Sequence, residues 1–289
     1  MIYDLLIAPF TQFDFMRRAL VAMIVLAFGV APAGVFLMLR RMSLMGDAMS
    51  HAILPGVAVA FLISGVNRIA MSIGGLIAGV LVALLSGLVT RVTPAKEDAS
   101  LAAFYLMSLA LGVAIVSSHG TNLDLLEILF GNVRALDALV LTIVAVNTTV
   151  SLFVFAIIYR PLVIECVDPL FLKTMGRAGA VAHLAFLALV VINLISAFLA
   201  LGTLLAVGLM ILPAAIAKFW SRDLTRMILI AVASAILSGY IGLVVTARSD
   251  IPAGPAVILV AGLFYFLSLL LGSEGGILRR LLPGRHLEA

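Results

Sequence analysis

Apolar residues in this chain occur in long runs that are separated by short polar breaks. A helix needs about 20 predominantly apolar residues to cross the hydrocarbon core of a bilayer. Nine runs approach or reach that length: 19–39, 48–64, 71–90, 101–117, 138–159, 180–200, 203–219, 226–247 and 256–272. Only Leu201 and Gly202 divide the sixth run from the seventh. The pattern therefore predicts an all-α polytopic membrane protein with about eight to ten transmembrane helices.

The composition excludes most classes of water-soluble protein. Of the 289 residues, 64% are hydrophobic and 11% are charged, whereas a soluble domain carries about 25% charged residues. No polar stretch is long enough to form a separate soluble domain, so we expect one transmembrane domain over residues 1–289. Cys166 is the single cysteine, which rules out an intrachain disulfide.

The net charge of +4 is explained by its placement along the chain. If the N-terminus lies outside, most of the 18 lysine and arginine residues fall in inner loops, as the positive-inside rule requires. The charge therefore gives no reason to expect a nucleic-acid partner.

The most informative polar residues are Asp47, which directly precedes the apolar second run, and His51, which lies inside it. Residues four apart share one face of a helix, and ionisable groups at membrane depth indicate a functional site. Carboxylate oxygen and imidazole nitrogen suit zinc or manganese. Two ligands are too few for a closed structural metal site. An incomplete site suits a transport path, because the transported ion must also be able to leave. The alternatives are that Asp47 or Ser43 caps a helix and that His51 is a packing residue.

Three further residues could contribute to an ion path. Asp98 opens the fourth run, where it either supports the helix start or adds an oxygen ligand. His119 and Asp124 lie in the outer segment after that run. We expect them either to be solvated loop residues or to capture the ion at the outer mouth.

Methionines and prolines add weaker indications. Four methionines lie at helical spacing, and soft thioethers could bind Cu(I), but core packing is favoured because methionine fills gaps and because two arginines interrupt the row. The methionines are Met38, Met42, Met45 and Met49. Three prolines are expected to interrupt helices, namely Pro32, Pro55 and Pro213.

Nucleotide-binding and zinc-protease signatures are absent from the sequence. Glycine precedes none of the three lysines, so there is no phosphate-binding P-loop. If transport is driven by ATP, the chain that hydrolyses it must be a separate subunit. The sequence also contains no HExxH helix, which disfavours an intramembrane zinc enzyme.

Four stretches, in a fixed order, resemble the zinc/manganese-type permeases of bacterial ABC importers. They are 39–51 running on to Pro55 and Gly56, 124–131, 168–176 followed by 207–215, and 250–255. One difference is that Leu172 stands four residues after Asp168, where the family usually has alanine.

This resemblance implies an all-helical homodimer of the ABC importer permease type in the bacterial inner membrane. It implies two cytoplasmic ABC ATPase subunits and an extracytoplasmic metal-binding protein as partners. Asp47 and His51 would line the metal path, with Asp98 as a further candidate. A segment at about 165–178 would dock on the ATPase through Asp168, Leu172 and Gly176.

We therefore predict the permease subunit of an ATP-driven importer for divalent transition metals, with zinc preferred to manganese. The metal ion would be cargo, and no cofactor would be bound permanently. The alternative is a proton-coupled secondary carrier, which would use the same aspartate and histidine as a proton relay and need no ATPase.

Overall fold

The computed structural model describes residues 6–65, 67–94, 97–118, 136–168, 177–249 and 251–278. All regular structure in these ranges is helical. The helices are α2 (Ala8–Gln12), α3 (Asp14–Leu39), α4 (Met45–Ala52), α5 (Leu54–Ser64), α6 (Arg68–Val92), α7 (Glu97–Ser118), α9 (Ala138–Val167), α11 (Arg177–Leu201), α12 (Thr203–Trp220), α13 (Leu224–Arg248) and α14 (Ala253–Leu271).

Within the described ranges, nine helical segments are long and apolar enough to cross a membrane. Each corresponds to one of the nine predicted runs, so the predicted all-α polytopic class is confirmed. The short helices α4 and α5 together form the second segment. The sixth and seventh are divided at Gly202, whose φ of 89° is a left-handed conformation that glycine adopts without a steric penalty.

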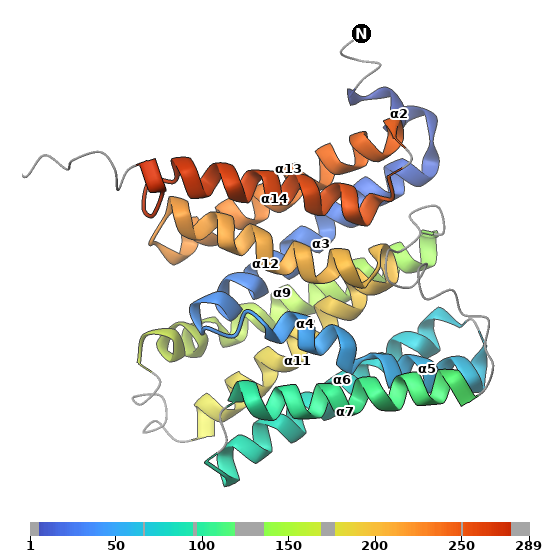
Figure 1. Ribbon diagram of the computed structural model, residues 1–289, viewed down its shortest axis with the longest axis vertical. Helices are drawn as coiled ribbons and strands as arrows, with labels where there is room; N and C mark the ends of the chain where they lie inside the picture. The colour runs from blue at the N-terminus through green and yellow to red at the C-terminus, as the bar shows by residue number, and fades with distance from the viewer. Residues whose placement is uncertain are drawn as a thin grey trace, which may run out of the picture.

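The spanning helices lie side by side in one bundle (Figure 1). Helix α3 packs against α9, α11, α12 and α13, while α14 covers α12 and α13. Helices α5, α6 and α7 pack together on the other side, and α11 joins them to the rest through α6. Short helix α4 lies between α7 and the α11–α12 pair.

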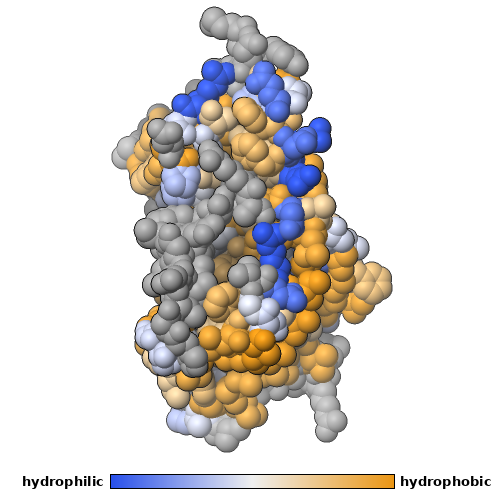
Figure 2. Space-filling view, turned by 90° about the vertical axis from the view of Figure 1, so that its right-hand side faces the viewer, coloured by the Kyte–Doolittle hydropathy of each residue, from blue (hydrophilic) through white to orange (hydrophobic). Residues whose placement is uncertain are grey.

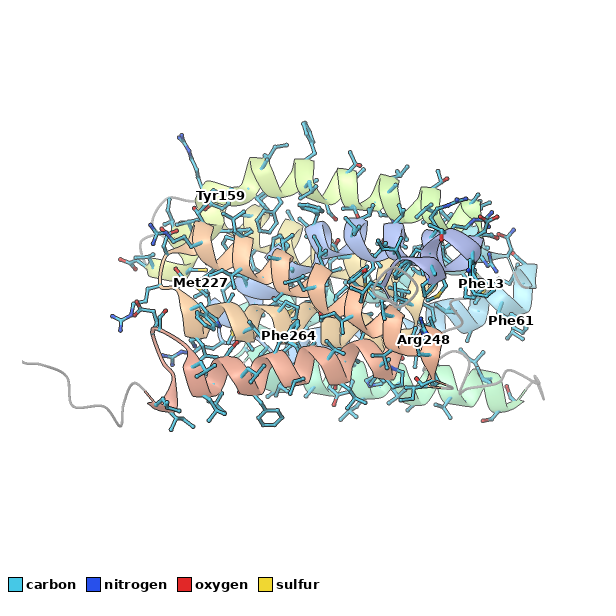
Figure 3. All side chains as sticks on the ribbon, turned by 90° about the horizontal axis from the view of Figure 1, so that it is seen from above. Phe13, Phe61, Tyr159, Met227, Arg248 and Phe264 are labelled. Atoms are coloured by element: carbon cyan, nitrogen blue, oxygen red, sulfur yellow. The ribbon has the colours of Figure 1, made fainter. Side chains whose placement is uncertain are left out.

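The two ends of the bundle can be recognised by the residues that lie at each of them. Figure 3 places Phe13, Phe61 and Arg248 at one end and Tyr159 and Met227 at the other. Figure 2 looks onto the first end, where hydrophilic side chains form a line bordered by apolar surface. Here the side chain of Arg68 pairs with Asp137, which joins the start of α6 to the start of α9. Which end faces the cytoplasm stays a prediction from the positive-inside rule.

Close approach of backbones holds the centre of the bundle together. A Cβ atom placed on Gly34 of α3 would lie 1.8 Å from the carbonyl oxygen of Met210 in α12. A Cβ on Gly56 of α5 would lie 2.0 Å from the carbonyl oxygen of Gly74 in α6. Small residues allow such contacts between membrane helices, where dispersion forces replace the hydrophobic effect between helices.

Three expectations about where helices end or are interrupted were wrong. Pro32 and Pro213 lie inside the continuous helices α3 and α12, so only Pro55 of the three prolines coincides with a break. The fifth run was predicted to end at residue 159, but α9 continues through Pro161 to Val167. Neighbouring helices can satisfy the backbone groups that a membrane proline frees, so the residue type alone does not fix a helix end.

Candidate metal site

Asp47 and His51 lie on the same face of α4. His51 Nε2 is 3.7 Å from Asp47 Oδ1, and the two side chains are 32% and 58% exposed in this single copy. Asp47 is the third residue of the helix and His51 the seventh, which is the spacing that brings side chains together. The pair presents one carboxylate and one imidazole to the same space.

The other side of α4 is packed against the bundle. Met45 is 3% exposed and Met49 is fully buried, and Met42 just before the helix is 6% exposed. The preference for core packing over a copper path is therefore confirmed for these three methionines. Leu44 is 79% exposed and lies in line with Asp47 and His51 at helical spacing. The open face of α4 thus consists of Leu44, Asp47 and His51.

Neither Asp47 nor Ser43 caps α4. The N-cap position is Leu44, and no side chain makes a capping hydrogen bond there. The hydroxyl of Ser50 donates to the backbone carbonyl of Asp47 at 2.7 Å. The carboxylate of Asp47 is therefore not engaged in capping this helix, which removes the structural alternative for that residue.

A break separates α4 from α5 directly after the site. Ile53 lies between the two helices, and Pro55 occupies the first turn of α5, where its missing N–H is tolerated. The hydroxyl of Ser108 in α7 donates to the carbonyl oxygen of Ala52 at 2.9 Å. A side chain from another helix therefore supplies a donor at the break.

This hydrogen bond also fixes the depth of the site. Ser108 is the twelfth of the 22 residues of α7, and a helix of that length extends about 33 Å, close to the hydrocarbon thickness. Ala52 therefore lies level with the middle of the bundle, and Figure 1 shows α4 well inside it. Asp47 is about 7.5 Å from Ala52 along the helix axis.

Helix α7 supplies two further contacts to the site that the sequence did not reveal. The ring of Tyr105 is stacked on the imidazole of His51, with centroids 6.4 Å apart and an angle of 29° between the planes. A Cβ on Gly112 would lie 3.0 Å from the backbone nitrogen of Pro55. With Ser108, these residues form one stripe of α7, but only the packing of α7 on α4 shows that the stripe belongs to the site.

The remaining predicted residues are placed only in part. The backbone of Asp98 lies in the first turn of α7, but its side chain is outside the described part of the structure. Asp168 follows the last residue of α9 as its C-cap and is exposed. His119, Asp124, Leu172 and Gly176 lie outside the described residues.

A complete metal site is not formed by one copy in the described ranges. No three histidine, cysteine, aspartate or glutamate side chains there are grouped so that they could hold an ion. Asp47 and His51 are thus a partial ligand set, open on one side.

Comparison with known proteins finds relatives that are membrane proteins of metal transport systems. The chain is 32% identical over 279 residues to a manganese transport system membrane protein, MntC, of Halalkalibacterium halodurans, covering 95% of this chain and 93% of that one. It is 28% identical over 267 residues to a probable iron transport system membrane protein of Haemophilus influenzae, covering 92% and 97%.

A solved structure has the same architecture. PsaBC from Streptococcus pneumoniae in complex with Fab is similar with a TM-score of 0.82 and 29% identity, covering 97% of this chain and 100% of that chain. The model of the ABC 3 transport family matches residues 12–272. This match spans most of the chain, and the chain therefore belongs to the ABC 3 transport family.

Proposed function

We propose that this chain is the permease subunit of an ATP-driven importer, and that a divalent transition metal ion passes between two copies at Asp47 and His51. The observation that carries this proposal is a partly exposed carboxylate–imidazole pair on a broken helix near the middle of the bundle. A charged side chain facing lipid at that depth is costly. The open face of α4 must therefore meet water or another protein surface.

A second copy would complete the site. Symmetric dimers place the same surface of each copy at the interface, so two open α4 faces would bring two aspartates and two histidines together. Four such ligands can hold an ion, and the site can release it when the two copies move apart. The broken helix agrees with the way transporters place binding sites near the bilayer midplane.

Manganese is the metal that we place first. Carboxylate and imidazole accept both zinc and manganese, and the sequence prediction put zinc first. The relative with 32% identity is named for manganese transport and another for iron, which favours manganese for this chain. The ion is cargo, and the proposal includes no permanently bound cofactor.

ATP hydrolysis is assigned to a separate cytoplasmic subunit. The sequence has no P-loop, and membership of an ABC family supports a partner that carries one. We propose that the 165–178 segment, with Asp168, Leu172 and Gly176, docks on that ATPase. An extracytoplasmic metal-binding protein would deliver the ion in the bacterial inner membrane, and His119, Asp124 and Asp98 remain candidates along the path.

The test measures ⁵⁴Mn accumulation in proteoliposomes that contain this chain, its ATPase and its binding protein. Replacing Asp47 or His51 by alanine should lower uptake at least about tenfold, since even outer-shell partners of a metal contribute that much. Asp14→Ala is the matched control, because this carboxylate is exposed and pairs with Arg17 one turn away.

Normal uptake by both site variants would remove the site assignment. Uptake by this chain alone, without ATPase or ATP, would instead support the proton-coupled carrier. Zinc accumulation that exceeds manganese accumulation under the same conditions would show that zinc is the preferred metal, as the sequence prediction had it.

A further inference from the structure

A buried cluster of three ionisable side chains lies outside the candidate metal site. Arg40 follows the last residue of α3, Glu165 lies in the last turn of α9, and His183 lies in the second turn of α11. Arg40 Nη2 donates to Glu165 Oε1 at 2.9 Å and to His183 Nδ1. His183 Nδ1 is 3.3 Å from Glu165 Oε1. The three helices are thus joined by one guanidinium group.

The two charged side chains of the cluster are largely buried. The side chain of Arg40 is 7% exposed and that of Glu165 16% exposed. The guanidinium carbon of Arg40 also lies 5.2 Å from the ring centre of Phe186, a cation–π contact. Because arginine only donates hydrogen bonds, Nδ1 of His183 is the acceptor in its contact with Arg40.

The cluster is not fully satisfied. Arg40 Nη1 and Glu165 Oε2 are buried, and neither has a hydrogen-bond partner within the described parts of the chain. A polar network in which every member is paired makes a structure rigid. This cluster instead keeps one spare donor and one spare acceptor, which are available for a second pairing pattern. The charges therefore have the capacity to exchange partners without leaving the cluster.

The position of the cluster connects two functional parts of the chain. Residues 40–44 are the connection from α3 to α4, so Arg40 lies seven residues before Asp47. Glu165 lies three residues before Asp168, and His183 lies six residues after the first residue of α11. Arg40 therefore ties the connection to α4 to both flanks of the proposed ATPase-docking segment.

We propose that Arg40, Glu165 and His183 form an ionic latch that transmits movement of the docking segment to α4. This inference rests on the function proposed above, and it assigns the three residues positioning roles without contact to the ion. A displacement of α9 relative to α11 would change the partners of Arg40. Leaving a buried charge unpaired carries a large free-energy penalty. Arg40 would therefore move together with its new partner, and the connection from α3 to α4 would move with Arg40.

The test uses the full importer complex in proteoliposomes and measures manganese uptake per ATP hydrolysed. Manganese binding to the permease is measured separately. Glu165→Gln and His183→Leu should lower uptake per ATP about tenfold, a typical allosteric coupling, while manganese affinity stays within about threefold. His183→Asn should retain uptake within about threefold, because its side-chain oxygen can accept in place of Nδ1. Arg160→Gln, at an exposed site five residues before Glu165 on α9, is the matched control.

Unchanged uptake per ATP in Glu165→Gln and His183→Leu would overturn the latch. Equal losses of uptake per ATP in His183→Leu and His183→Asn would show a structural role only and would also overturn the latch. The same holds if the loss of uptake parallels a loss of manganese binding or of folded complex. If Glu165→Gln does not fold, the two His183 variants decide the matter. A wild-type complex that accumulates no manganese would instead refute the proposed function.

Discussion

At the residue scale, the candidate site depends on how the His51 ring is held. The imidazole stacks on Tyr105, and a stacked aromatic pair contributes about 0.5–1.5 kcal/mol beyond the area that it buries. His51 is also partly exposed, so this ring contact restricts a side chain that would otherwise sample several rotamers.

Replacement of Tyr105 therefore should weaken metal binding without removing a ligand. We expect Tyr105→Ala to raise the manganese concentration for half-saturation about threefold to tenfold. Tyr105→Phe keeps the ring and should bind like the wild type. Equal affinities of the alanine variant and the wild type, measured by calorimetry on the purified complex, would show that the stacking does not position His51.

Asp137 is a second residue whose surroundings lead to a specific expectation. The backbone N–H of Val140 donates to its carboxylate, and Arg68 pairs with it. These contacts outweigh partial burial and lower the pKa of Asp137 below the ordinary 3.8. Because the folded state has the lower pKa, the carboxylate contributes stability above pH 3.8, and this contribution is lost as the pH falls through the lowered value.

The expected result is a pH-dependent difference between variants. Asp137→Ala should lower stability by about 1 kcal/mol at neutral pH, because it removes the N-cap of α9. Asp137→Asn keeps the cap and loses only the charge, so its difference from the wild type should shrink at pH values below 3.8. Thermal unfolding in detergent measures both effects. A difference between Asn and wild type that does not change with pH would contradict the assignment.

At the scale of the element, the break between α4 and α5 is stabilised from outside. The Ser108 hydroxyl bonds to the carbonyl of Ala52, where the helix cannot continue regularly because Pro55 has no N–H. Pro32 and Pro213 stand in unbroken helices. The same residue type therefore breaks one helix and not two others, and the surrounding helices decide which.

Removal of this donor should destabilise the broken segment. Ser108→Ala leaves the Ala52 carbonyl without its side-chain partner, and we expect a loss of about 1–3 kcal/mol in the free energy of unfolding. Ser118→Ala is the control on the same helix, because its exposed hydroxyl donates to the carbonyl of Ile115 in its own last turn. Equal melting temperatures for the two variants would show that the contact across the break contributes nothing.

At the scale of the whole molecule, α3 and α12 pack closely against each other in the part of the bundle that also contains α13 and α14. The contact depends on Gly34, whose missing side chain admits the Met210 backbone. Gly262 is a useful comparison, because a Cβ there would meet no atom within 4 Å. The two glycines thus differ in their surroundings and not in their chemistry.

Gly34→Ala should therefore prevent normal assembly. The added methyl group would overlap a backbone oxygen that cannot rotate away, and we expect a loss of more than about 3 kcal/mol. Gly262→Ala should fold and elute like the wild type. Monodisperse elution and an unchanged melting temperature for Gly34→Ala would show that α3 and α12 do not need this close contact.

The sequence by itself determined that the chain is an all-helical membrane protein with about eight to ten apolar segments, and that Asp47 and His51 share a face. Both features are local: the bilayer requires long apolar runs whatever their neighbours are, and helical spacing aligns residues four apart. Only the tertiary structure decided that Tyr105 and Ser108 join the site and that Arg40 is buried against Glu165 and His183. These contacts join residues far apart in the chain, so they depend on which helices pack together. The pattern of apolar residues along the chain does not specify which helices become neighbours.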